Sequence, residues 1–237
     1  MKEIELSGLD TLYDKKVQCP FCSHSFTSKK VRIKFIKPLK VDSDFGPIFA
    51  KEDKNNPLFY YVIVCPNCGF SFTEDFSKPF GQLTKQKVED EISKKIDRNI
   101  DYCGVRDFLG AERAYKLAIY SGQLIGENHI VFANLCLRLA WINRGTGKKE
   151  EERRFLQLAA SEFEQSYINT DFIPKNMPEI QILYLIGELN RQLGNSSKAV
   201  RYFSAVIGHP EKSKNSKYVN LARSQWKLAA DEYRGIK

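Results

Sequence analysis

The front third of the chain alternates apolar and polar residues with a period of two. In segment 31–35, Val, Ile and Phe alternate with Arg and Lys, which is the pattern of a strand with one buried face. Segment 59–64 is a run of aromatic and β-branched residues, Phe-Tyr-Tyr-Val-Ile-Val, and also favours a strand. The pattern therefore predicts a small β domain over residues 1–80.

Beyond this segment, apolar residues recur every three or four positions, which is the period of an amphipathic helix. A connecting helix and linker are expected over residues 81–104, with an apolar face of Leu83, Val88, Ile92 and Ile96. Over residues 105–237, apolar stripes follow one another between Gly and Pro residues and predict an all-α domain. The last stripe, at 218–229, is expected to cap the stack of helices. The predicted fold class is α+β.

A repeat is visible within the expected helical domain. Small and apolar residues follow the spacing of a tetratricopeptide hairpin at Gly187, Gly194, Ala199, Phe203, Val206 and Pro210. A weaker upstream copy uses Ala140, Gly147, Leu156 and Ala159, with Glu152 where a small residue is expected. The repeat favours tetratricopeptide-like helical hairpins. An antiparallel bundle of another kind would use the same apolar stripes and is the alternative.

Two copies of a Cys-Pro-x-Cys motif give the strongest chemical signal in the chain. Cys19 and Cys22 belong to the first copy, and Cys65 and Cys68 belong to the second, which is followed by Gly. Two thiols so spaced in a tight turn face the same concavity, and two such turns supply the four sulfurs of a structural zinc site. The duplication predicts one structural Zn²⁺ and a zinc-ribbon-like β domain.

Other uses of these cysteines are less favoured. Paired disulfides need an oxidising compartment, and residues 1–5 lack the apolar core of a secretion signal. A redox motif would place one Cys pair at the start of a helix, whereas both pairs here lie between strand-like segments. His24 is close enough in sequence to replace one Cys as a ligand, which is the remaining alternative.

The chain also lacks an apolar run long enough to span a bilayer, so we expect a soluble, cytoplasmic protein without membrane contact.

The positive charge of the chain makes nucleic acid the second hypothesis for its partner. The net charge is +8, and residues 15–41 contain no acidic residue. A candidate basic patch consists of Lys29, Lys30, Arg32 and Lys34. Binding of nucleic acid would need exposed aromatic rings beside these cations, such as Phe35, Tyr60 or Tyr61. The alternation places Phe35 in the core, and Lys outnumbers Arg, so sequence-specific reading of bases is disfavoured.

The insert between the two Cys motifs offers the third hypothesis, an enzyme. It is rich in turn-forming residues and carries Asp42 and Asp44 in one short segment. Two carboxylates in a turn are usually solvated or capping, and the sequence has neither a glycine-rich phosphate loop nor a metalloprotease helix. We therefore expect a protein that is not an enzyme, with catalysis by these carboxylates as the least favoured alternative.

Several segments together resemble the bacterial domain-of-unknown-function 2225 family. They are the stretch before and through the first Cys motif (12–22), segment 29–32, the Asp-Ser-Asp-Phe segment (42–45), segment 56–60, and the second Cys motif with its Gly and Phe (65–70). The helical part fits as well, and Phe59 stands where we would expect Tyr. The resemblance implies a cytoplasmic bacterial protein with a paired-knuckle metal site and tetratricopeptide-like hairpins. It implies no activity.

The preferred hypothesis for function is a non-enzymatic, zinc-binding adaptor. Stacked helical hairpins present a long groove for a protein or peptide partner. Helical phase makes Tyr184, Asn190 and Arg191 the candidate partner-binding residues. The sequence identifies neither the partner nor the oligomeric state.

Overall fold

The computed structural model describes residues 9–50, 55–76, 80–173 and 177–235. The chain start, the ribbon end expected at 77–79 and Pro174 therefore lie outside the described residues. The chain divides into two compact units, and each takes two separate pieces of sequence. The first unit contains segments 9–39 and 49–126, and the second contains 40–48 and 127–235.

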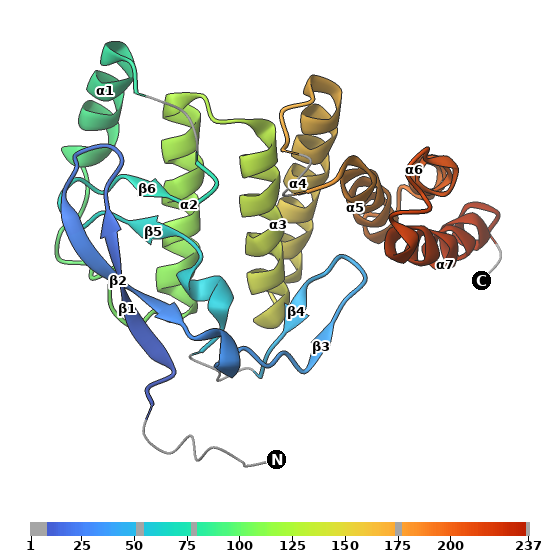
Figure 1. Cartoon of the computed structure of the whole chain (residues 1–237), viewed down its shortest axis with the longest axis horizontal. Helices are drawn as coiled ribbons and strands as arrows, with labels where there is room; N and C mark the ends of the chain where they lie inside the picture. Colours follow the sequence, from blue (N-terminus) through green and yellow to red (C-terminus); the bar gives the residue numbers. More distant parts are fainter. Residues whose placement is uncertain (1–8, 51–54, 77–79, 174–176, 236–237) are drawn as a thin grey trace. The chain divides into compact units, whose positions relative to one another are not determined.

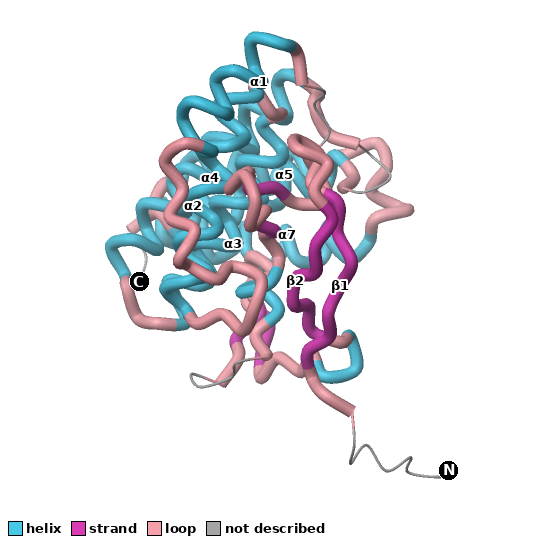
Figure 2. Tube along the Cα trace, turned by 90° about the vertical axis from the view of Figure 1, so that its left-hand side faces the viewer, coloured by secondary structure: helices cyan, strands magenta, loops and turns pink. Residues whose placement is uncertain are grey.

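Two antiparallel strand pairs lie in the first unit. Strand β1 (Leu12–Gln18) pairs with β2 (Ser25–Val31) along its whole length, and Figure 2 shows these long strands side by side. Strand β5 (Ile63–Val64) pairs with β6 (Ser71–Phe72). Each pair is joined by a turn that carries one of the Cys motifs. The expected ribbon of hairpins, with the cysteines at the turns, is present.

The helices of the first unit pack against these strands. Helix α1 (Gln82–Val88) continues into a π-helical turn (Glu89–Ser93), and α2 (Phe108–Ile125) follows (Figure 1). Val88 and Ile92 are buried beside the cysteines, as the apolar stripe predicts. Leu83 was expected on the same face but is 82% exposed.

The two predicted strands, 31–35 and 59–64, are strands only in part. Residues Ile33–Phe35 and Pro57–Tyr60 form short 3-10 helices, whereas Val31 ends β2 and Ile63–Val64 is β5. The β1–β2 ladder ends at the Leu12–Val31 pair, so the chain beyond Val31 has no strand to pair with. At the second segment, Pro57 lacks an N–H for a ladder and the Asn56 side chain caps the turn by accepting from Leu58 N. Apolar alternation alone did not contain this information.

The predicted domain boundary near residue 105 is also wrong. Helix α2 belongs to the first unit, because its face of small residues packs on β6 and on the Pro57–Tyr60 turn. Ala111, Ala114 and Ala118 are fully buried there. The Tyr115 hydroxyl donates to Leu58 O at 2.9 Å. The boundary lies at 126/127, and segment 40–48 belongs with the later helices.

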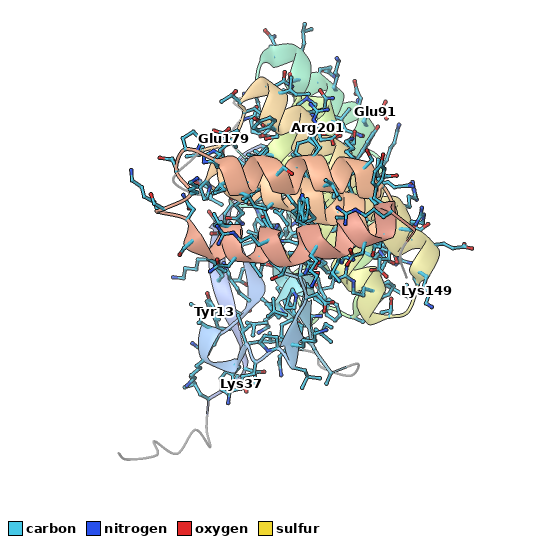
Figure 3. All side chains as sticks on the ribbon, turned by 90° about the vertical axis from the view of Figure 1, so that its right-hand side faces the viewer. Tyr13, Lys37, Glu91, Lys149, Glu179 and Arg201 are labelled. Carbon is cyan, nitrogen blue, oxygen red and sulfur yellow. The ribbon has the colours of Figure 1, made fainter. Side chains whose placement is uncertain are left out.

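The second unit is a series of antiparallel helices. They are α3 (His129–Gly145), α4 (Lys149–Asn169), α5 (Glu179–Gln192), α6 (Ser196–Gly208) and α7 (Ser216–Tyr233). Consecutive helices pack on each other, and α5 also touches α7. Figure 3 looks onto α6 and α7, with Arg201 on the exposed side of α6. Within the described residues, no helix is both long and apolar enough to cross a membrane.

A short hairpin from the front of the sequence completes the second unit. Strand β3 (Lys40–Val41) pairs with β4 (Pro47–Ile48). The turn between them is closed by Phe45 N donating to Asp42 O and Asp42 N donating to Gly46 O, both at 2.9 Å. We call residues 40–48 the insert hairpin.

Close packing of α5 on α6 depends on one glycine. A Cβ added at Gly187 would lie 2.9 Å from two ring carbons of the fully buried Phe203. We expect Gly187→Ala to destabilise the second unit by about 1–3 kcal/mol, since overpacking shifts side chains from their rotamers. Both tryptophans, Trp141 and Trp226, lie in this unit, so urea unfolding followed by Trp fluorescence measures the loss.

Gly208→Ala is the matched control for this substitution. Gly208 ends α6 and has no atom within 4 Å of an added Cβ. It should be neutral or stabilise by up to about 1 kcal/mol, because Ala is the better helix former. Equal losses in the two variants would contradict the packing argument.

Candidate metal centre

The two Cys motifs form turns with the same backbone hydrogen bonds. In the first, Ser23 N donates to Cys19 O and Cys19 N donates to His24 O, both at 2.9 Å. In the second, Gly69 N donates to Cys65 O at 2.8 Å and Cys65 N donates to Phe70 O at 3.0 Å. The residue after each second cysteine has a positive φ, which is 60° at Ser23 and 73° at Gly69. The sequence repeat is therefore a structural repeat.

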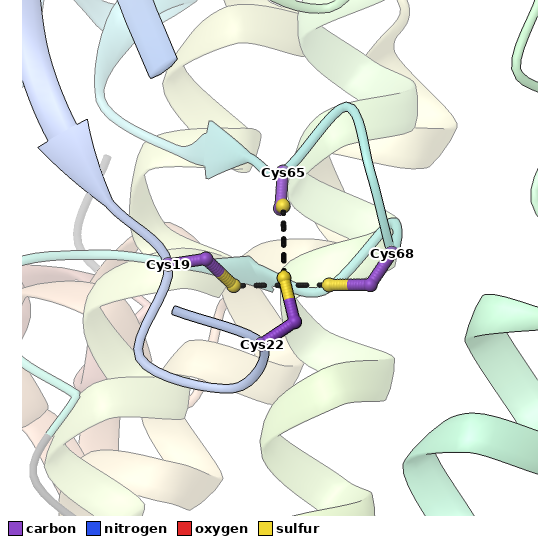
Figure 4. Close-up of side chains that lie close together, drawn as sticks. All are labelled: Cys19, Cys22, Cys65 and Cys68. Carbon is purple, nitrogen blue, oxygen red and sulfur yellow. Dashed lines mark hydrogen bonds between the residues drawn. The ribbon is translucent and has the colours of Figure 1, made fainter. Parts of the chain in front are cut away.

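These turns bring the four sulfurs together. The Sγ atoms of Cys19 and Cys68 are 3.7 Å apart, those of Cys22 and Cys65 are 3.6 Å apart, and all four lie within 4.8 Å of one another. Figure 4 shows the lines that join the two pairs crossing each other, as opposite edges of a tetrahedron do. A ZnS₄ tetrahedron with Zn–S of about 2.3 Å has edges of about 3.8 Å. The sulfurs thus fit one tetrahedral ion.

Burial makes a cation necessary for the charged form of this cluster. Cys19, Cys65 and Cys68 are buried and Cys22 is half-buried. Hydrogen bonding to Cys19 and Cys68 lowers the pKa of the Cys65 thiol, whereas hydrogen bonding to Cys65 raises the pKa of Cys19. Four adjacent thiolates removed from water require a compensating positive charge. The Asn67 side chain also donates to Cys22 Sγ at 3.6 Å, the kind of outer contact that orients a metal ligand.

An aromatic cluster surrounds the cysteines. Phe70 is fully buried, and its ring centroid lies 5.3–6.3 Å from those of Phe21, Phe72, Phe76 and Phe80. The described residues around the site thus give it apolar walls and a closed set of four thiols. Such a site suits a structural ion, because a catalytic zinc keeps a position open for water.

A family model described as "Uncharacterized protein conserved in bacteria (DUF2225)" matches residues 12–229. The chain belongs to this family. The match covers both Cys motifs and α1–α6, and it ends within α7. Neither a curated protein nor a solved structure matches the chain. The DUF2225 family description names no activity.

His24, the alternative metal ligand, takes another role in this DUF2225 chain. Its backbone oxygen accepts from Cys19 N, and its exposed ring stacks on Phe26 with ring centroids 6.1 Å apart. Among the described residues, the potential metal-binding group consists of the four cysteines alone.

The predicted partner-binding residues are not open to solvent. Tyr184 is fully buried, and Asn190 is 2% exposed and donates to Ile186 O at 2.8 Å. Arg191 is half-buried and paired with Glu188 at 2.8 Å. The expectation that Tyr184 and Asn190 line an open groove is therefore wrong. Helical phase placed Tyr184 on the correct face of α5, but the insert hairpin covers this side chain.

The candidate basic patch is largely paired with acidic groups. Lys29 lies 3.0 Å from Asp14, and Lys30 lies 2.8 Å from Glu74. The Arg32 guanidinium stacks over Tyr13 and donates to Asp10 O. Lys34 lies over the ring of Phe35.

The rings that nucleic-acid binding would need are not freely exposed either. Tyr60 is 4% exposed, and Phe35 and Tyr61 are half-buried. This arrangement gives little support to a base-stacking surface. Whether the patch binds nucleic acid stays a prediction.

Asp42 and Asp44, the candidate catalytic pair, share one cation that the sequence did not suggest. Arg144 on α3 donates to Asp42 at 3.1 Å and makes a two-pronged contact with Asp44 at 2.7 and 3.1 Å. Burial disfavours the charge on Arg144, but the hydrogen bonds and charges of Asp44 and Glu152 outweigh it and raise its pKa. The 100 residues between Asp44 and Arg144 explain why no local pattern linked them.

The positive φ at the second Cys turn leads to a testable prediction. We expect Gly69→Ala to destabilise the first unit by about 2 kcal/mol or more, since a side chain is strained in this backbone conformation. The added Cβ would also lie 2.8 Å from Cβ and Cγ1 of Ile96. Faster hydrogen exchange of the β1 and β2 amides would measure the loss.

Ser23→Ala is the matched control, because Ser23 holds the same position in the first turn and already carries a side chain at positive φ. It should change stability by no more than about 0.5 kcal/mol. A Gly69→Ala protein as stable as Ser23→Ala would contradict the prediction.

Proposed function

We propose that this protein is a non-enzymatic adaptor of the bacterial cytoplasm. A structural zinc ion on Cys19, Cys22, Cys65 and Cys68 holds the first unit together, and the second unit binds a protein or peptide segment. The zinc assignment is supported by an all-thiolate set with tetrahedral spacing, since soft thiolate ligands select Zn²⁺ over harder cations. The reducing cytoplasm is the compartment that keeps such thiols free of disulfides.

One observation supports the adaptor role most directly. The helices α3, α5 and α7 each contribute side chains to a single face, and this face already holds an irregular peptide segment of the chain, residues 42–46. These helices hold the first position of successive helix pairs, the position that lines the groove in tetratricopeptide-like stacks. We therefore assign a tetratricopeptide-like repeat to α3–α7. The groove residues are suited to hold extended polypeptide.

The two other hypotheses are less well supported. Nucleic-acid binding would use the candidate basic patch, whose cations are largely engaged by Asp14, Glu74 and neighbouring rings. Catalysis by Asp42 and Asp44 would need carboxylates free to exchange protons, and both are held by Arg144.

Metal analysis tests the first half of the proposal. Protein purified without added zinc should contain one equivalent of zinc per chain. A fully folded protein without metal, or disulfides within the two Cys pairs, would refute the structural zinc ion.

Affinity capture from a lysate of the source bacterium, with and without nuclease, tests the second half. We expect capture of a protein partner that survives nuclease and weakens in Lys217→Glu, which changes an exposed side chain at the edge of the groove. Lys212→Glu is the matched control, since Lys212 is also an exposed lysine but lies in the turn that precedes α7. Capture that nuclease abolishes, or that fails when the candidate basic patch is neutralised, would favour the nucleic-acid hypothesis.

A further inference from the structure

The insert hairpin is held by the helices through contacts that resemble recognition of a ligand. Both of its acidic side chains bind Arg144. Asp44 is fully buried and accepts hydrogen bonds from both Nη atoms. Asp42, which is partly exposed, accepts a hydrogen bond from Nη1. Glu152 and Gln192 accept from the remaining guanidinium N–H groups at 2.6 and 3.1 Å. Because these contacts fix the planar Arg144 guanidinium, its two Nη groups present a pair of donors whose spacing matches a carboxylate.

The backbone oxygen and the hydroxyl group of Ser43 also form hydrogen bonds with α5. Tyr184 donates its hydroxyl hydrogen to Ser43 O at 2.7 Å. Ser43 Oγ donates to Glu188 at 2.6 Å, and Arg191 donates to the same carboxylate at 2.8 and 3.0 Å. Because Glu188 is fully buried and its charge is balanced by Arg191, the groove contains a prepared acceptor for a hydroxyl group.

An aromatic residue then anchors the turn. The ring of Phe45 lies 5.4 Å from that of Tyr184 and 6.1 Å from that of Tyr218, and Lys217 Nζ lies 5.4 Å above it. Gly46 follows directly against Trp141, where an added Cβ would lie 2.7 Å from Cδ1. The groove therefore selects, in order, two acidic groups around a small hydroxyl residue, an aromatic ring and a glycine.

We propose that the groove formed by α3, α5 and α7 is a receptor for acidic–aromatic peptides of the form Asp-Ser-Asp-Phe-Gly, and that residues 42–46 are its internal occupant. An external peptide of this chemistry binds only when the insert hairpin leaves, so the chain controls its own binding site. This inference rests on the proposed adaptor function and adds to it the chemistry of the partner and the means of regulation.

Tethering explains why the internal segment would normally prevail. A ligand on a short linker acts at an effective concentration of about mM, which a weakly binding external peptide does not exceed. The apparent affinity for the external peptide is lowered by the fraction of chains whose groove is free. Weakening the internal segment should therefore strengthen external binding, a sign opposite to that of ordinary damage to a site.

The test uses the full chain and a labelled peptide with the sequence of residues 38–50. Its binding is measured by fluorescence anisotropy to the wild-type chain, to a chain with residues 42–46 replaced by Gly and Ser, and to Phe45→Ala. We expect both altered chains to bind the peptide at least about tenfold more tightly than the wild type does. Peptides with Asp42→Asn and Asp44→Asn, or with a scrambled order, should lose this binding.

Further variants connect the binding to the groove. Arg144→Gln in the Phe45→Ala chain should abolish peptide binding, whereas Lys212→Ala in the same chain should leave it unchanged. A folded Phe45→Ala chain that binds natural and scrambled peptides equally would overturn the proposal, as would unchanged affinity after Arg144→Gln. The Phe45→Ala chain decides the question if the five-residue replacement fails to fold, because its turn retains Asp42, Ser43, Asp44 and Gly46.

Two other results separate this inference from related ones. If the replacement chain forms a mixed dimer with the wild-type chain and ignores the free peptide, the occupant is the hairpin of a second copy and the proposal is wrong. The peptide assay needs no natural partner. Both assays use the Phe45→Ala chain. Peptide binding to this chain without capture of a protein by it from lysate would refute the adaptor function alone, and capture without peptide binding would refute this inference alone.

Discussion

Replacing Cys65 by Ser is expected to unfold the first unit and leave the second unit folded. Zinc binding to thiolate sites supplies on the order of 10 kcal/mol to the folding of small metal domains, which is comparable to the total stability of such a domain. Three of the four cysteines lie in the core cluster with Phe70, Val88 and Ile92, so loss of the proposed zinc ion is expected to open this core as well. Hydrogen exchange should show lost protection in β1, β2 and α2, with protection of α3–α7 retained.

Cys103→Ser is the matched control for this experiment. Cys103 belongs to the same unit and is half-buried, but it lies outside the four-cysteine cluster. It should leave the exchange pattern unchanged. Simultaneous loss of protection in both units of Cys65→Ser would mean that they unfold together and that the division into two units has no thermodynamic meaning.

The second large effect is expected at the buried ion network of the insert hairpin. Asp44→Asn should destabilise the second unit by about 3 kcal/mol, because removing one partner leaves the other charge buried and incompletely paired. The remaining contacts of Arg144 with Asp42 and Glu152 place the loss at the lower end of the range for such pairs. Urea unfolding followed by Trp fluorescence measures this loss.

Asp42→Asn provides the comparison, since it removes a carboxylate from the same arginine at a site that is 20% exposed. Its cost should not exceed about 1 kcal/mol, as for pairs near the surface. If the two variants lose equal stability, the burial of Asp44 does not determine the strength of the network.

Local sequence patterns predicted those parts of the molecule that depend on local geometry. The spacing within each Cys motif fixes a turn with two sulfurs on one side, and the repetition of the motif indicated the four-sulfur cluster. The helix stripes likewise predicted α3–α7, and the fold class is confirmed as α+β. Gly187 was identified from its spacing alone, and it does lie where α5 approaches the ring of Phe203.

The misjudged parts depend on partners that are distant in sequence. Segment 31–35 has the alternation of a strand, but a strand also needs a partner strand. Strand β1 begins at Leu12, which pairs with Val31, so no residue of β1 is left to pair with 32–35. Tyr184 was placed on the correct face of its helix and still proved buried, because a hairpin 141 residues earlier covers it. Asp44 was expected to be a solvated or capping turn residue, because its partner Arg144 lies 100 residues later in the sequence.

The insert hairpin leaves the ribosome long before the helices that hold it. Both Cys motifs and α2 are complete by residue 125, so all four cysteines and the helix that packs on their unit are made early in synthesis. The partners of residues 42–46 emerge much later, with Tyr218 among the last. At 5–20 residues per second, Phe45 waits on the order of ten seconds or more for Tyr218. During this interval the segment can meet Arg144 and Tyr184 as they emerge, but its contact with α7 is complete only after Tyr218 has been made.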